Sequence, residues 1–331
     1  NNNWVVDGKW ASVTSPDLSA KGYKAPRFEN GTSAARVDEV IVGSDTKDAT
    51  VNVYYDHNLI PIGPDNFDKH GVDRSQIEKQ VKETVHYVGA GDKTPADHVQ
   101  TSKWTRTITI DAVTKEVVPN GQYTTDWTIP KGEKTEYAQV NTPVVNGYYA
   151  GQANVPATAV TQKDIERTVT YKQIGRIIPV DEAGKPIPGA PTPQYHNDPT
   201  DPTRAAVTDS PVISGYTIKD PTQSKITPSN PGQNTNVVYV RNDVTATIKY
   251  IDDTAGDDLS TYNKSITAKP GEALKYTTKD SITKLQNTGY VLVSDNFNVT
   301  TMPEKGGNYE VHVKHGVDRS QIEKQVKETV H

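Results

Sequence analysis

Alternation of apolar and polar residues with a period of two is the dominant pattern along the chain. Val, Ile, Thr and Tyr fill most of the alternating positions, and these residues suit strands with one buried face. The clearest runs, each predicted to be a strand, are 107–111, 168–171, 237–240, 246–251 and 309–313. Gly and Pro separate the runs and mark tight turns between short strands. The pattern therefore predicts a mainly β protein.

Two segments have features of a helix. Residues 277–287 place Ile282 and Leu285 on one side. Gly289 follows just beyond the end, which is a common helix stop signal. Residues 73–84 are ambiguous, because their apolar positions share one face of either a helix or a strand. The Thr-Val-His-Tyr-Val run that comes next favours a strand with at most a short helical lead. One helix on a small sheet favours a β-grasp, or ubiquitin-like, module.

An internal repeat is the strongest single signal. The string HGVDRSQIEKQVKETVH stands at 70–86 and again, unchanged, at 315–331. Chance does not produce such an identity, so one repeat unit extends over 70–314 and the next copy begins at 315. Tandem repetition is typical of arrays in which each small module contacts only its neighbours.

A looser order of motifs recurs within this unit and ahead of it. A proline, a Gly-Tyr pair and a closing β-run follow one another in 1–58 and again in 70–172, and the last two motifs recur further on. The Gly-Tyr pairs stand at 22–23, 147–148, 215–216 and 289–290. Residues 1–58 are therefore interpreted as the back half of a module whose complete version lies at about 70–172. The expected fold is mainly β with minor α, an elongated tandem array of small β-grasp modules.

Composition narrows the function classes. Charged residues make up 23% of the 331 positions and apolar residues 33%, which suits several small cores better than one large core. The net charge of −5 and the lack of a basic stripe argue against nucleic acid. Cysteine is absent, as in exported bacterial proteins that avoid disulfides. No apolar stretch approaches the roughly 20 residues of a membrane helix, so no membrane insertion is expected. Because the chain starts without Met, we interpret it as a fragment.

Several long strings carry a family resemblance. They are IIPVDEAGKPIPGAPTPQYHNDPTDPT, TIKYIDDTAGDDL followed by GYVLVSDNF, and TVHYVGAGDKTPADHVQTSKWTRTITIDAVTKEV. In wording and order they resemble the mucus-binding repeats (Mub, or MucBP-type, domains) of lactobacillus surface adhesins. The resemblance covers nearly the whole chain. It implies β-grasp-like modules that adhere to host mucin glycoproteins, with immunoglobulins as a second class of partner.

The same resemblance implies an extracellular, cell-wall-anchored protein of a Gram-positive bacterium, with its export signal and anchor outside this fragment. The repeat and the recurring order of motifs indicate how the chain divides. Five segments are expected: the end of a preceding mucus-binding module with a linker at 1–69, a mucus-binding β module at 70–172, a Pro-rich β module at 173–242, a β-grasp-like module at 243–314, and the start of the next repeat at 315–331.

Aromatic side chains are the candidate glycan contacts, because sugar C–H faces stack on aromatic rings. Trp104, Tyr148 and Tyr149 are the residues chosen in the 70–172 module. Trp127 recurs at the place of Trp4, which indicates a packing role. A second candidate site is the acidic loop 252–258, an oxygen-rich, Gly-containing loop of the kind that ligates Ca²⁺, although its spacing is not that of an EF-hand. Its four candidate ligands are Asp252, Asp253, Asp257 and Asp258.

Motifs of enzymes are missing from the sequence. It has no Gly-x-Ser-x-Gly, no phosphate-binding loop, no Cys nucleophile and no clustered histidines for zinc. We therefore expect no catalysis and no required cofactor, with calcium as an optional structural ion. The predicted function is multivalent, weak binding of mucin glycans. Two alternatives stay open: a structural stalk that projects a distal head, and an immunoglobulin-binding module.

Overall fold

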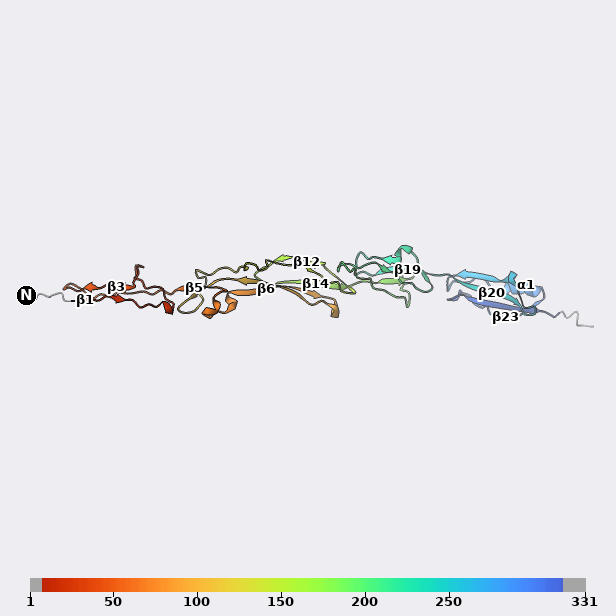
Figure 1. The fold of residues 1–331 in the computed structure, drawn as a ribbon. Coiled ribbons are helices and arrows are strands. Elements are labelled where there is room, and N and C mark those ends of the chain that lie inside the picture. The colour runs from red at the N-terminus through yellow and green to blue at the C-terminus, as the bar shows by residue number, and fades with distance from the viewer. Residues whose placement is uncertain (1–7, 318–331) are drawn as a thin grey trace, which may run out of the picture. The chain divides into compact units, whose positions relative to one another are not determined.

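The computed structural model describes residues 8–317, which form a mainly β protein with one short α-helix, α1 (Lys279–Asn287) (Figure 1). The predicted fold class is thus confirmed at this level. The chain divides into two compact units. One comprises the residues up to Lys172 together with Thr200–Thr203, and the other comprises Gln173–Pro199 together with the residues from Arg204 onward. The predicted next copy, 315–331, lies outside the described residues except for 315–317.

Residues 8–58 form two short antiparallel ribbons. The strand pairs are β1 (Lys9–Trp10) with β4 (Val40–Ile41), and β2 (Val13–Thr14) with β3 (Arg36–Val37). A 3-10 turn at Ser19–Lys21 ends at Gly22, which has the left-handed φ of 94°. Ala34 is buried here, whereas several large apolar side chains stay exposed. This segment therefore has little core of its own.

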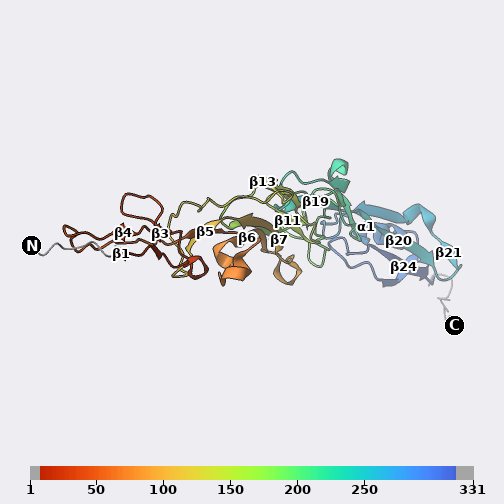
Figure 2. The ribbon, with the colours of Figure 1, turned by 60° about the vertical axis from the view of Figure 1, so that its left-hand side comes forward.

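The next module is built around a four-stranded sheet with β6 near its centre (Figure 2). The order β11-β14-β6-β7 joins Tyr148–Ala150, Ile165–Gln173, Glu78–Val88 and His98–Thr105. Pairing of β6 is antiparallel with β7 and parallel with β14, where Tyr87 lies opposite Val169. The core-facing side of β6 carries Val81, Val85 and Tyr87, all buried.

Three smaller strand pairs complete this module. They are β5 (Leu59–Ile62) with β8 (Ile108–Asp111), β9 (Glu136–Tyr137) with β13 (Thr158–Ala159), and β10 (Val140–Asn141) with β12 (Asn154–Val155). β5 packs Ile62 against Ile77 and Ile108. β5 therefore contributes to the hydrophobic core of this module although it lies before residue 70, the expected start of the module.

In the Pro-rich segment a parallel pair again joins the first strand to the last. The strands are β15 (Ile177–Val180), β16 (Thr208–Asp209), β17 (Tyr216–Ile218), β18 (Lys225–Ile226) and β19 (Thr235–Arg241). β15 pairs in parallel with one edge of β19, and β17 pairs antiparallel with the other edge of β19. Ile187 and Tyr195 are buried in the proline-rich loop, so much of that loop is ordered within the second unit.

The C-terminal sheet has the same parallel pairing and adds the helix. Its strands are β20 (Val244–Asp252), β21 (Asp257–Asp258), β22 (Lys264–Ala268), β23 (Tyr290–Asp295) and β24 (Gly307–His315). β20 pairs in parallel with β24, while β22 and β23 pair antiparallel at the two sides. Leu285 of α1 is buried against Ile248, Tyr250 and Val311, because the helix lays its apolar side on the sheet.

Each of the five predicted runs corresponds to an observed strand. All five alternating runs lie within β8, β14, β19, β20 and β24, apart from Thr107, which precedes β8. The helix begins at Lys279 rather than at residue 277, and it ends at Asn287 as predicted. The ambiguous segment is a 3-10 turn, Arg74–Gln76, followed by β6. A short helical lead into a strand was the correct interpretation.

A tyrosine hydroxyl donates to a proline carbonyl oxygen at the same place in three parts of the chain. The pairs are Tyr55 with Pro16 at 2.7 Å, Tyr171 with Pro143 at 2.6 Å, and Tyr239 with Pro211 at 2.6 Å. Each bond ties the closing run to the proline that precedes a Gly-Tyr pair. Burial raises the pKa of Tyr171 to about 12. In these three parts of the chain, the proline and the closing run that recur in the sequence are joined by the same hydrogen bond.

Candidate functional site

A tight turn at the start of β6 places the polar side chains of the candidate site. The Asp73 carboxylate accepts a hydrogen bond from the Ser75 backbone N–H at 2.8 Å and caps the 3-10 turn Arg74–Gln76. Hydrogen bonds from Ser75 also lower the pKa of Asp73. Ile77 follows and is fully buried. The turn is therefore fixed by the Asp73 cap at its start and by the buried Ile77 side chain at its end.

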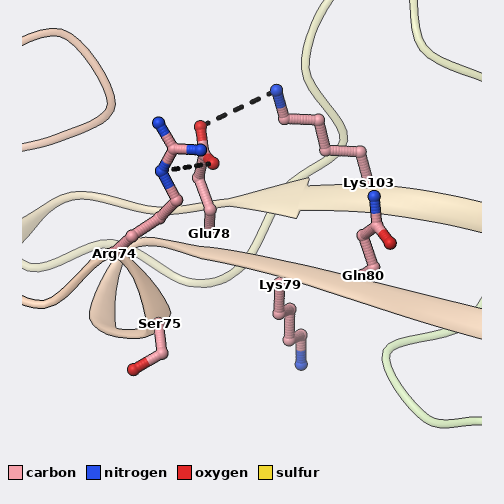
Figure 3. A pocket seen from close by; sticks show the side chains of 6 residues that line it. All are labelled: Arg74, Ser75, Glu78, Lys79, Gln80 and Lys103. Carbon is pink, nitrogen blue, oxygen red and sulfur yellow. Dashed lines mark ion pairs between the residues drawn. The ribbon is translucent and has the colours of Figure 1, made fainter.

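A polar groove lies beside this turn, between the start of β6 and the end of β7 (Figure 3). It encloses about 450 Å³. The lining residues are Arg74, Ser75, Glu78, Lys79, Gln80 and Lys103. Figure 3 shows Arg74, Glu78 and Lys103 on one side of β6, whereas the side chains of Lys79 and Ser75 point to the other side. Beside Glu78 the groove therefore has two cations and one carboxylate, an excess of positive charge.

Glu78 organises the two cations at one side of the groove. Its Oε2 lies 3.6 Å from Nε of Arg74, and its Oε1 lies 3.7 Å from Nζ of Lys103. Figure 3 shows both ion pairs, with Arg74 and Lys103 reaching Glu78 from different elements. The side chain of Glu78 is 18% exposed, against 68% for Arg74 and 43% for Lys103. A half-buried carboxylate thus positions two cations that remain accessible to a ligand.

Trp127 borders the groove through Lys79. The Nζ of Lys79 and the Cζ of Arg106 each lie 4.7 Å from the centroid of a Trp127 ring, a cation–π distance. Trp127 also packs against the buried cluster of Val81, Trp104, Tyr137 and Val160. The packing role inferred from its recurrence is therefore what the structure shows, and two cations lie against its rings.

The predicted aromatic contacts are not gathered at this groove. Trp104 is only 8% exposed, and its indole N–H donates to Ser102 Oγ at 3.2 Å. Glycan contact by Trp104 stays a prediction, and its burial shows that most of the side chain is covered by the protein. Tyr148 and Tyr149 are half-buried in β11, and Tyr148 packs on the cluster that contains Val85. For these two tyrosines, glycan contact stays a prediction.

The acidic loop after β20 is held together by protein donors. Asp252 is 2% exposed and accepts hydrogen bonds from the Thr254 and Ala255 backbone N–H groups. His315 Nε2 lies 2.8 Å from the same carboxylate. Burial alone would raise the pKa of Asp252, but these three donors outweigh it and lower the pKa.

The remaining members of the loop make separate contacts. Asp253 lies 2.6 Å from His312 Nδ1, and Asp258 accepts a hydrogen bond from Asn263 at 2.9 Å. Among residues 8–317 no group of three or more His, Cys, Asp or Glu side chains is arranged to hold a metal ion. Calcium binding by Asp252, Asp253, Asp257 and Asp258 stays a prediction.

Membrane-spanning helices were also considered. Within residues 8–317 no helix is long and apolar enough to cross a membrane.

The groove residues could not be recognised from the sequence, because isolated charged residues along a strand are usually exposed to solvent. Arg74, Glu78 and Lys79 all belong to the repeated string, and Lys103 alternates with the buried Trp104 along β7. Repetition of a charged string is the signal that points to them. Which of these charges meet at one place depends on the pairing of β6 with β7.

Two family models match separate parts of the chain. The family model of the Muc B2-like domain matches residues 72–175, and the model of a mucin binding domain matches residues 244–315. No curated protein matches the chain.

Three solved structures are among the matches to this chain. The MucBP domain of an adhesion protein from Pediococcus pentosaceus is 35% identical, over 29% of this chain and 98% of that chain, with a TM-score of 0.24. The mucin-binding domain of Spr1345 from Streptococcus pneumoniae is 24% identical, over 29% and 92%, with a TM-score of 0.23. The type 2 repeat of the mucus binding protein MUB from Lactobacillus reuteri is 22% identical, over 47% and 78%, with a TM-score of 0.31.

Proposed function

Because the chain belongs to the family of mucus-binding repeats, we propose that it binds mucin glycoproteins and that the groove at the start of β6 contacts their glycans. The observation that carries this proposal is the excess of cations in that groove, with Glu78 holding Arg74 and Lys103 in place. The amide group of Gln80 is suited to hydrogen bonds with sugar hydroxyls. The cations are suited to the carboxylates or sulfate esters of acidic sugars.

The groove is shallow, so one copy binds weakly. Each unit of the repeat brings one copy of the string that forms it. Linking weak sites raises the effective concentration of the second site once the first is bound. The proposed activity is therefore adhesion without catalysis, and retention on a mucin surface grows with the number of units.

The repeating parallel pair of first and last strands supports a β-grasp type of module. It occurs in β6–β14, β15–β19 and β20–β24. On this basis we keep module limits at 70–172, 173–242 and 243–314 as a proposal, with β5 added ahead of the first. We also propose a surface location on a Gram-positive cell wall, which suits an adhesin built from exposed small modules.

Binding of the chain to immobilised mucin tests the proposal. Replacing Arg74 and Lys103 together by Gln should lower retention about tenfold, because two charge-assisted contacts are lost. Lys82→Gln is the matched control, since Lys82 is exposed on β6 but does not line the groove. Retention should also fall as the salt concentration rises. Equal retention of the double variant and the control would contradict a groove contact.

Each alternative function has its own signature in the same assay. A structural stalk would show no retention of the unaltered chain on any mucin. Immunoglobulin capture is favoured by the edge strand β23, where Val291, Leu292 and Val293 are 45%, 37% and 49% exposed. An exposed apolar edge is suited to adding a strand from a partner. Retention of antibody fragments that resists competing glycans, and that Leu292→Lys abolishes, would support this second activity.

A further inference from the structure

Lys79 and Arg106 are two cations that form no ion pair with a carboxylate in the described part of the chain. The cations of the groove differ in this respect, because Arg74 and Lys103 share Glu78. Lys79 contributes to the lining of the groove, but its side chain points to the side of β6 opposite Glu78 (Figure 3). A second group of cations therefore lies apart from the pair that Glu78 organises.

Both of these cations lie against the indole of Trp127. The Lys79 Nζ and the Arg106 Cζ are each 4.7 Å from the centroid of a Trp127 ring. One backbone acceptor fixes each side chain further. Lys79 Nζ donates to the Gln162 carbonyl oxygen at 3.1 Å, and Arg106 Nε donates to the Gln76 carbonyl oxygen at 2.7 Å. We call the three residues Lys79, Arg106 and Trp127 the Trp127 patch.

The Trp127 patch is half-buried and keeps donors for a ligand. The two terminal nitrogens of Arg106 have no acceptor among the described residues, and Lys79 uses only one of its three N–H groups. Asp126 precedes Trp127, but it is exposed and pairs with neither cation. Two like charges held at one side chain repel each other, and a bound anion would remove this repulsion.

We propose that the Trp127 patch binds a sulfate ester carried by a sugar of the mucin glycans. This inference rests on the proposed function and adds a second site with its own ligand group. A sulfate ester presents oxygens in several directions, so it can accept hydrogen bonds from Lys79 and Arg106 at once. The oxygens of a carboxylate lie in one plane and suit a single guanidinium fork. Partial burial of both cations strengthens their attraction for the anion, because less water screens it.

NMR of the tryptophan indole N–H groups measures binding at this patch directly. The chain has four tryptophans, and Trp127→Phe identifies the signal of Trp127. A monosulfated galactose should shift that signal until it saturates, whereas galactose should leave it in place. N-acetylneuraminic acid, which carries a carboxylate instead of a sulfate, should bind more weakly than the sulfated sugar. A shift of equal size with galactose, or no shift with the sulfated sugar, would overturn the proposal.

Paired variants separate the Trp127 patch from the groove. Lys79→Gln combined with Arg106→Gln should weaken the binding of sulfated galactose at least about tenfold, because two charge-assisted contacts are lost. Arg106→Lys keeps the charge beside the indole and should lose less affinity than Arg106→Gln. Arg74→Gln combined with Lys103→Gln is the matched control and should leave this affinity unchanged. Unshifted signals of the other tryptophans show that each variant is folded.

Failure of this inference is distinguishable from failure of the proposed function. If the variant of Lys79 and Arg106 binds sulfated galactose as well as the unaltered chain does, or if the variant of Arg74 and Lys103 loses that binding, then the Trp127 patch is not the site. Tighter binding of N-acetylneuraminic acid than of sulfated galactose would overturn the assignment of a sulfate ester. In each of these cases, retention on mucin that depends on the groove would leave the proposed function standing.

Discussion

Glu83 is expected to destabilise the module that contains it. It lies on the core-facing side of β6 between Val81 and Val85, and it is 0% exposed. Neither of its carboxyl oxygens has a hydrogen-bond partner in the described part of the chain. Burying a polar group without a partner costs roughly 1–3 kcal/mol. Replacing Glu83 by Leu removes this cost and keeps a similar volume.

The expected gain in the free energy of unfolding follows from three terms, of which the removed cost of the unpaired carboxyl is the first. Leu also buries apolar surface where the carboxyl was, worth roughly 1–2 kcal/mol at about 0.8 kcal/mol per methylene. Imperfect packing of the Leu side chain in this core lowers the gain in stability by about 1 kcal/mol. We therefore expect Glu83→Leu to raise the free energy of unfolding by about 1–4 kcal/mol. For a domain of this size each kcal/mol corresponds to roughly 4–8 °C in the melting temperature.

Urea unfolding followed by tryptophan fluorescence measures this change within one module. Trp104 and Trp127 both pack in the cluster of Val81, so they report on the unfolding of this core. Glu83→Gln keeps an unpaired polar group and should stay within about 1 kcal/mol of the unaltered chain. Lys82→Leu changes an exposed neighbour and should shift stability by less than about 0.5 kcal/mol. A loss of more than about 1 kcal/mol in Glu83→Leu would refute the reasoning, because the carboxyl would then have a stabilising partner.

Three further predictions concern the recurring bonds, one histidine and one glycine. Tyr171→Phe and Tyr239→Phe should each lower the free energy of unfolding by about 1 kcal/mol, since each removes a hydroxyl bond to a proline carbonyl oxygen; denaturant titration of both variants checks this, and no change in either would contradict it. Asp253, and then Glu310, raise the pKa of His312 above its usual value. The folded form thus holds its proton more tightly, so this contribution is complete below the usual pKa of about 6.5 and is lost as pH rises through the folded value. Thermal unfolding between pH 5 and 9 should show this loss in the unaltered chain and a flatter profile in His312→Gln. Gly89→Ala should cost more than about 2 kcal/mol, because Gly89 has a φ of +97° and an added Cβ would lie 2.2 Å from the Tyr171 carbonyl oxygen. Gly184→Ala, at a φ of +78° with open space around it, should cost only about 1 kcal/mol; equal losses in the two glycine variants would mean that the close approach is unimportant.

Local patterns in the chain were enough to find several of the longer strands, the helix and the repeat. Alternation along residues such as 246–251 is a direct consequence of the period of a strand, so it can be read without knowing the partner strand. The helix at Lys279–Asn287 has its own periodicity and stop signal. The family likeness likewise rests on strings of neighbouring residues. None of these requires contacts between distant parts of the chain.

Burial and the meeting of side chains required the tertiary structure. Trp104 and Lys103 are neighbours in β7, yet one faces the core and the other the groove, because pairing with β6 decides which side of the sheet is covered. Alternation along a strand says that two faces differ, but which face is dry depends on the strand or sheet that covers it.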